Sequence, residues 1–145
     1  HSWINGACQM GFHIAIASPK GYQVNYDIVE NAKRYAEKNG GTITLTHDPK
    51  EAAENANVIY TDVWASMGQE EESAKRIQDF KGYQVDKSIM ALADKDAVFM
   101  HCLPAHRGEE VSEEVLESKA SVIFDEAENR LHVQKAILID CIGGI

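Results

Sequence analysis

Short apolar segments alternate with longer segments of helical periodicity along this 145-residue chain. The apolar segments are rich in β-branched residues and are predicted strands: FHIAIAS, TITLT, NVIYTDVW, AVFMHC and SVIFD. Most of the segments between them place apolar residues three and four positions apart, as amphipathic helices do. Strands joined through helices run parallel. The alternation therefore predicts an α/β fold, a doubly wound parallel sheet flanked by helices, in one domain.

Several helix ends are predicted from single residues. The opening segment HSWINGACQMG should be a helix that ends at Gly11, and NYDIVENAKRYAEKN a helix that ends at Gly40. In DPKEAAENA, Asp48 is the expected N-cap and Pro49 the first helical residue. Four more helices are expected over GQEEESAKRIQDF, KSIMALA, SEEVLES and ENRLHVQKAILIDCI.

Composition restricts the partners and the compartment. Fourteen Lys and Arg against 23 Asp and Glu give a net charge of −9, which argues against binding to nucleic acid or to an anionic membrane surface. No apolar run approaches the roughly 18 residues that a membrane-spanning helix needs. The three cysteines are an odd number without disulfide-type spacing, so a reducing, cytoplasmic compartment is expected.

Ligands of such sheets bind at the carboxyl ends of the strands. After one predicted strand, Asp62 precedes Ser66, Met67 and Gly68 at the start of a helix. Backbone N–H groups before a helix can hold a carboxylate, and a nearby Asp can hold an ammonium group. Together they would suit a zwitterionic amino acid. The simpler alternative is that Ser66 caps the helix and Asp62 is a solvated strand end.

The segment HCLPAHRG leaves several alternatives open. A metal site of His101, Cys102 and His106 lacks a companion ligand motif. A nucleophilic Cys–His pair is disfavoured because neighbouring residues of a strand point to opposite faces. Cys102 could instead line a pocket as an ionisable group, or be a buried free thiol. The Leu103–Pro104 bond can be cis, which would turn a carbonyl toward a ligand.

Arg130 lies in the first turns of the last predicted helix. Its planar guanidinium group would suit an oxyanion, although a surface salt bridge with Glu126 is the ordinary alternative. Nucleotide binding has no support, because the chain contains neither G-x-G-x-x-G nor G-x-x-x-x-G-K-[ST].

Six segments together resemble the ornithine carbamoyltransferases: SPKGYQ, NGGTITLTHDP, DVWASMGQE, KGYQVDKSIM, HCLP and FDEAENRLHVQKA. The resemblance spans residues 1–145 and is confined to the ornithine-binding half of that family. It implies a Rossmann-like sheet that lacks its first central strand. The expected strand order is 42–46, 12–17, the missing strand, 57–62, 97–101 and 121–124.

The resemblance also assigns substrate-binding residues. It implies that Asp62 and Ser66 hold the α-amino group of ornithine and that the backbone at Met67 helps to hold its α-carboxylate. Cys102 would lie beside the side-chain amine, and Leu103 would offer its carbonyl oxygen to the carbamoyl group. The thiol then belongs to the floor of a pocket and is not a covalent nucleophile.

The implied reaction transfers a carbamoyl group from carbamoyl phosphate to ornithine and gives citrulline and phosphate. Cys102, Asp62 and Arg130 are the expected catalytic residues, with Arg130 at the carbamoyl phosphate oxygen. The resemblance implies no metal and no other cofactor, and a homotrimer for the full-length enzyme of arginine biosynthesis or the urea cycle. The family's Ser-Thr-Arg-Thr-Arg phosphate-binding stretch does not occur here, so the chain alone is expected to be inactive. The alternatives are carbamoyl transfer to another amine such as putrescine, and a non-catalytic binding module.

Overall fold

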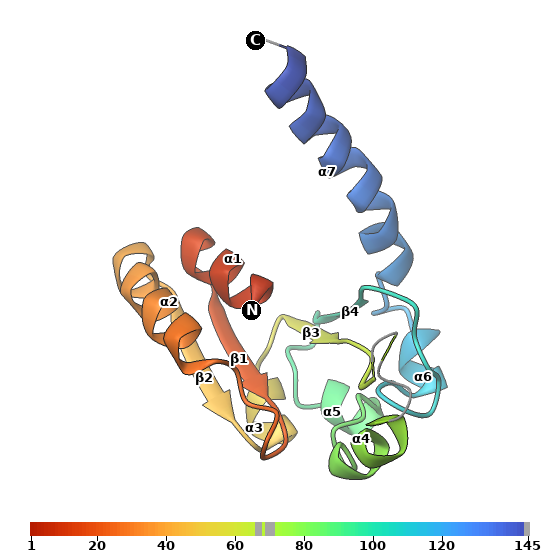
Figure 1. Cartoon of the computed structure of the whole chain (residues 1–145). Coiled ribbons are helices and arrows are strands. Elements are labelled where there is room, and N and C mark those ends of the chain that lie inside the picture. The colour runs from red at the N-terminus through yellow and green to blue at the C-terminus, as the bar shows by residue number, and fades with distance from the viewer. Residues whose placement is uncertain (66–67, 69–71, 144–145) are drawn as a thin grey trace. The chain divides into compact units, whose positions relative to one another are not determined.

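The computed structural model (Figure 1) describes residues 1–65, 68 and 72–143. The chain divides into two compact units, His1–Glu54 and Asn55–Ile145. Their helices and strands alternate, as the sequence predicts. The first unit holds α1 (Ser2–Met10), β1 (His13–Ala17), α2 (Tyr26–Asn39), β2 (Thr42–Thr46) and α3 (Pro49–Ala53). The second holds β3 (Val58–Thr61), α4 (Ser73–Asp79), α5 (Lys87–Met90), β4 (Val98–His101), α6 (Glu113–Leu116) and α7 (Ile123–Gly143).

In the first unit, β1 and β2 form a parallel pair in which His13 lies opposite Thr42 and Ala17 opposite Thr46. This confirms the predicted adjacency of these two strands. Helices α1 and α2 pack together and enclose a small apolar core (Figure 1). Its buried residues are Ile4, Cys8, Val29, Ala32 and Ala36, with partly buried strand residues packed against them.

The helix ends of this unit follow the predicted capping residues. Gly11 and Gly40 adopt the left-handed conformation with φ of 75° and 82°, and each donates its N–H to a carbonyl of the preceding helix. The carboxylate of Asp48 accepts the N–H of Lys50 at 2.8 Å, and Pro49 is the first residue of α3. All three boundary predictions are confirmed.

We expect Gly11→Ala to lower the free energy of unfolding by about 1–3 kcal/mol, because an L-residue is strained at this φ. The new Cβ would also meet the backbone carbonyl oxygen of Asn39. Gly6→Ala is the matched control. Gly6 lies inside α1 with open space around it, so the change should stabilise by about 0.5–1 kcal/mol. Urea denaturation of both variants tests the pair, and equal losses would contradict the assignment of Gly11 as a strained cap.

In the second unit, β3 and β4 form a parallel pair in which Val58 lies opposite Val98 and Thr61 opposite His101. This confirms the second predicted adjacency. The buried side chains of this unit include Phe99, Val111 and Val115, none of which is more than 2% exposed. Among the described residues the two strand pairs are separate sheets, and the strand order across them stays a prediction.

The predicted strand over residues 121–124 is wrong. Only Ser121 pairs with β4, through one isolated parallel bridge to Phe99. The N–H of Phe99 donates to the carbonyl of Ala120, and the N–H of Val122 donates to the carbonyl of Phe99. From Ile123 the chain is already helical, because Glu126 donates its N–H to Val122 and closes the first turn of α7. The short apolar run is thus divided between one bridge and the helix start.

In GQEEESAKRIQDF the described helix α4 covers Ser73–Asp79, and residues 69–71 of that segment lie outside the described residues. The helices α5 (Lys87–Met90) and α6 (Glu113–Leu116) are shorter than the predicted segments KSIMALA and SEEVLES. The long helix α7 contains the closing helix that the sequence predicts and begins before it (Figure 1). Within the described residues, none of the helices is both long and apolar enough to cross a membrane.

Candidate active site

The carboxyl ends of β3 and β4 bring together Asp62 and Cys102, which are 40 positions apart in the sequence. Each follows the last residue of its strand, and those last residues, Thr61 and His101, lie opposite each other. The Cys102 thiol donates to Oδ1 of Asp62 with an Sγ–Oδ1 distance of 3.2 Å. This contact agrees with the rule that neighbouring parallel strands end at the same edge of a sheet.

The described residues bind only one of the two oxygens of the Asp62 carboxylate. Its Oδ1 accepts the N–H of Val63 at 2.7 Å in addition to the Cys102 thiol. The residue is exposed, and no described residue donates to its Oδ2. One carboxylate oxygen is therefore oriented by the protein, while the other can accept a hydrogen bond from a bound cation such as an ammonium group.

Cys102 is a thiol with a raised pKa. Partial burial has the largest effect on this pKa, because it disfavours the charged thiolate. The hydroxyl group of Tyr60 has the next largest effect and lowers this pKa, while the Asp62 carboxylate raises it as hydrogen-bond acceptor and as a neighbouring negative charge. A covalent nucleophile would need the opposite shift, because the thiolate is the reactive form. The raised pKa therefore argues against Cys102 as a covalent nucleophile.

We expect Cys102 to react with iodoacetamide only at higher pH than an ordinary thiol, since its raised pKa lowers the thiolate fraction at any given pH. Asp62→Asn should move the alkylation profile of Cys102 to lower pH, because the nearby negative charge is removed. Mass spectrometry of each cysteine peptide measures the rates, with the exposed Cys141 as internal standard for the reagent. An unchanged profile in Asp62→Asn would show that the carboxylate does not act on the thiol.

His101 lies beside the thiol in sequence but has different partners. Its side chain is fully buried, with Nε2 3.2 Å from Oε1 of Glu110. Its Nδ1 accepts the N–H of Leu103 at 2.9 Å, so the ring proton belongs on Nε2 and is donated to Glu110. The sequence expectation that His101 does not activate Cys102 agrees with this geometry.

These bonds define the shape of the turn after β4. Leu103 has a φ of 55°, which is rare for a residue with a branched side chain, and the Leu103–Pro104 bond is cis, as the sequence allowed. The bond from the Leu103 N–H to His101 holds this conformation. His101 therefore positions the backbone of the turn, a task that sequence reasoning had left unassigned.

Sequence reasoning missed two carboxylates that support this turn. Glu110 is fully buried and accepts the His106 N–H at 2.6 Å as well as the His101 ring proton. Glu126 accepts the backbone N–H of His101 at 3.0 Å from the first turn of α7. Nothing in the sequence distinguishes the buried Glu110 from its neighbour Glu109, so only the tertiary structure could identify it.

The structure does not bring the remaining predicted residues into described contact with Asp62 or Cys102. Arg130 is exposed on α7, and no described contact joins it to Asp62 or Cys102. The alternative salt bridge between Arg130 and Glu126 is also not found among the described ion pairs, and Glu126 accepts the backbone N–H of His101. Ser66 and Met67 lie outside the described residues.

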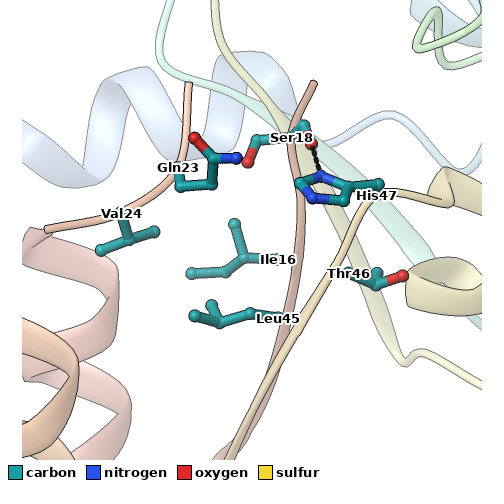
Figure 2. Close-up of a pocket in the computed structure, with 7 residues that line it drawn as sticks. All are labelled: Ile16, Ser18, Gln23, Val24, Leu45, Thr46 and His47. Atoms are coloured by element: carbon teal, nitrogen blue, oxygen red, sulfur yellow. Dashed lines mark hydrogen bonds between the residues drawn. The ribbon is translucent and has the colours of Figure 1, made fainter. Parts of the chain in front are cut away.

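The first unit has a separate small pocket at the carboxyl ends of β1 and β2 (Figure 2). Ile16, Val24 and Leu45 form its apolar side. The rim is polar, and there Nδ1 of His47 lies 2.6 Å from the carbonyl oxygen of Ser18.

Comparison with known protein families identifies the class of protein to which this α/β chain belongs. Residues 1–141 match the family model described as aspartate/ornithine carbamoyltransferase, Asp/Orn binding domain. The chain belongs to this family.

Particular relatives narrow the match to ornithine carbamoyltransferases. The enzyme of that name from Nitratiruptor sp. is 60% identical over 139 residues, which are 96% of this chain and 45% of the relative. The solved ornithine carbamoyltransferase of Pyrococcus furiosus superposes with a TM-score of 0.94 at 48% identity, covering 100% of this chain and 46% of that one. The anabolic enzyme of Campylobacter jejuni gives a TM-score of 0.93 at 45% identity, covering 99% of this chain and 48% of that one. The chain spans about half the length of these relatives.

Proposed function

We propose that residues 1–145 form the ornithine-binding domain of a carbamoyltransferase that transfers the carbamoyl group of carbamoyl phosphate to the side-chain amine of L-ornithine. The products are citrulline and phosphate. The observation that carries this proposal is the contact between Cys102 and Asp62 at the ends of β3 and β4, in a chain of the carbamoyltransferase family. A paired thiol and carboxylate at this edge suit an amine substrate, and family membership supplies the reaction.

The chemistry needs an uncharged amine. The side-chain amine of ornithine resembles that of Lys and is almost wholly protonated at pH 7, so it cannot attack until the proton has left. The nitrogen then bonds to the carbonyl carbon, and the bond from that carbon to the phosphate oxygen breaks. Asp62 would receive the proton, while the Cys102 thiol, kept neutral by its raised pKa, would favour binding of the neutral amine. The rest of the rate comes from holding two substrates in line and stabilising the oxyanion.

The remaining roles follow the family resemblance. We assign Asp62 and Ser66 to the α-amino group of ornithine and the backbone of Met67 to its carboxylate. The carbonyl of Leu103 would contact the carbamoyl group, and its orientation is supported by the bond from the Leu103 N–H to His101. Arg130 would approach the carbamoyl phosphate oxygen from α7.

The cellular setting is part of the same proposal. The substrates are ornithine and carbamoyl phosphate, and the assembly is a homotrimer of the full-length polypeptide acting in arginine metabolism. Cys8, Cys102 and Cys141 are all free thiols, which supports a reducing, cytoplasmic compartment.

Comparison of three amines in one assay tests the proposal on the native polypeptide. Ornithine carries an α-ammonium and an α-carboxylate group, N-acetylornithine lacks the ammonium charge, and putrescine lacks the α-carboxylate but keeps a second ammonium group. We expect carbamoylation of ornithine, with kcat/KM at least about 100-fold below it for the other two amines. Preference for putrescine would support the alternative enzyme. The absence of carbamoylation of any amine, together with a thermal shift caused by ornithine, would support a binding module.

A further inference from the structure

The turn between β4 and α6 gathers three metal-ligating side chains that the proposed reaction does not use as ligands. One donor atom each from His106, Glu109 and Glu110 can be chosen so that all three lie within 4.8 Å of one another. His106 is exposed, Glu109 is half-buried and Glu110 is fully buried. The cluster therefore reaches from solvent to the interior of the second unit.

A second observation points to a ligand at this cluster. Glu110 is 0% exposed, and its Oε2 has no hydrogen-bond donor. Its Oε1 takes both available donors, the His106 N–H and the His101 ring. A buried carboxylate oxygen without a donor is costly, and native proteins rarely leave one without an ion or water.

The neighbouring arginine does not satisfy this oxygen. Arg107 extends from the same turn but pairs with Glu113 and Glu117. What faces Oε2 of Glu110 is Nδ1 of His106, at 3.7 Å. That separation is too long for a hydrogen bond. Two ligands that bind one zinc ion tetrahedrally lie about 3.4 Å apart, so the observed pair is close to a coordination geometry.

The backbone prepares the cluster. Gly108 adopts a φ of 85°, which bends the chain between His106 and Glu109, and the Glu109 N–H donates to the His106 carbonyl at 3.1 Å. The Glu109 carbonyl in turn accepts the side-chain amide of Gln84 at 2.8 Å. Hydrogen bonds thus already fix the turn that carries the three metal-ligating side chains. A rotamer change of the half-buried Glu109 would bring its carboxylate into position beside the other two ligands.

We propose that His106, Glu109 and Glu110 bind a divalent transition-metal ion. One imidazole nitrogen and two carboxylate oxygens suit zinc or cobalt(II) better than magnesium, which prefers oxygen ligands alone. Oε1 of Glu110 keeps its bonds to His106 and His101 while Oε2 binds the ion. The ion therefore clamps the turn and has no part in the carbamoyl transfer.

The test uses the native polypeptide, freed of metal by dialysis against a chelator and titrated with Zn²⁺ and with Co²⁺. We expect one equivalent to bind and to raise the melting temperature. His106→Gln and Glu109→Gln should each weaken binding by about tenfold or more. His132→Gln is the matched control, because His132 also lies beside a glutamate, at 3.1 Å from Glu128, but on the exposed surface of α7. Its affinity should stay within about twofold of the wild type.

The cobalt spectrum separates this site from binding at the thiol. Cobalt held by nitrogen and oxygen shows no thiolate charge-transfer band, and Cys102→Ala should leave the affinity unchanged. Loss of binding in Cys102→Ala, or a thiolate band, would overturn the proposal, as would affinities unaffected by His106→Gln and Glu109→Gln. Circular dichroism of the metal-free variants shows whether they fold. If His106→Gln does not fold, Glu109→Gln decides the outcome.

Discussion

The 145-residue chain, purified by itself, is expected to form no citrulline from ornithine and carbamoyl phosphate. Carbamoyl phosphate is a dianion at neutral pH and needs several cationic or N–H donors at its phosphate group. The sequence contains no clustered Arg motif for this purpose, and the chain spans about half the length of its relatives. A second reason is the unpaired strand edges expected where the central strand is missing, in a fold stable by only about 5–15 kcal/mol.

A colorimetric citrulline assay measures this directly, with the native polypeptide as positive control. Circular dichroism of the 145-residue chain separates a folded, inactive domain from an unfolded one. Citrulline formation by the chain alone, abolished in its Cys102→Ala variant, would contradict the expectation. It would mean that these residues bind both substrates without a second half.

Asp62→Asn in the native polypeptide is expected to lower kcat/KM for ornithine by about 100-fold or more, equivalent to roughly 2.7 kcal/mol. An amide has nearly the same shape and can still accept from Val63 and from the Cys102 thiol. The substitution therefore removes the charge that an ammonium group requires while leaving the local geometry intact. KM for carbamoyl phosphate should change by no more than about twofold.

Two variants serve as comparisons in the same steady-state assay. Asp96→Asn removes an exposed carboxylate that pairs with Lys95 and lies just before the amino end of β4. This variant should leave the kinetic constants for both substrates unchanged. Arg130→Ala should show the reverse bias and weaken the use of carbamoyl phosphate more than that of ornithine. Equal losses for both substrates in Asp62→Asn would mean that this carboxylate organises the whole site.

Much of the local structure could be predicted from the sequence. Capping depends on single residues and their neighbours, so Gly11, Gly40 and Asp48 were enough to predict three helix boundaries. The alternation of strand and helix patterns predicted parallel strands, and the family resemblance predicted that β1 lies beside β2 and β3 beside β4. That pairing brings Asp62 to Cys102, because neighbouring parallel strands end at the same edge.

The segment SVIFD shows where local pattern fails. A short apolar run is compatible with a strand or with a helix start, and its own residues do not decide between them. In the fold only Ser121 finds a partner on β4, and the helical bond from Glu126 to Val122 takes over from there. The helix therefore begins at Ile123, earlier than the sequence predicts.

By itself, the sequence determined the order of strands and helices, apart from residues 121–124, and the three helix boundaries at Gly11, Gly40 and Asp48. These follow from interactions between near neighbours and from the geometry that parallel strands share. Only the tertiary structure decided which glutamate is buried, what His101 holds, and in which direction the pKa of the Cys102 thiol is shifted. The burial and the electrostatic environment of a side chain depend on residues that are distant in sequence and meet only in the fold. A local sequence pattern therefore cannot predict them.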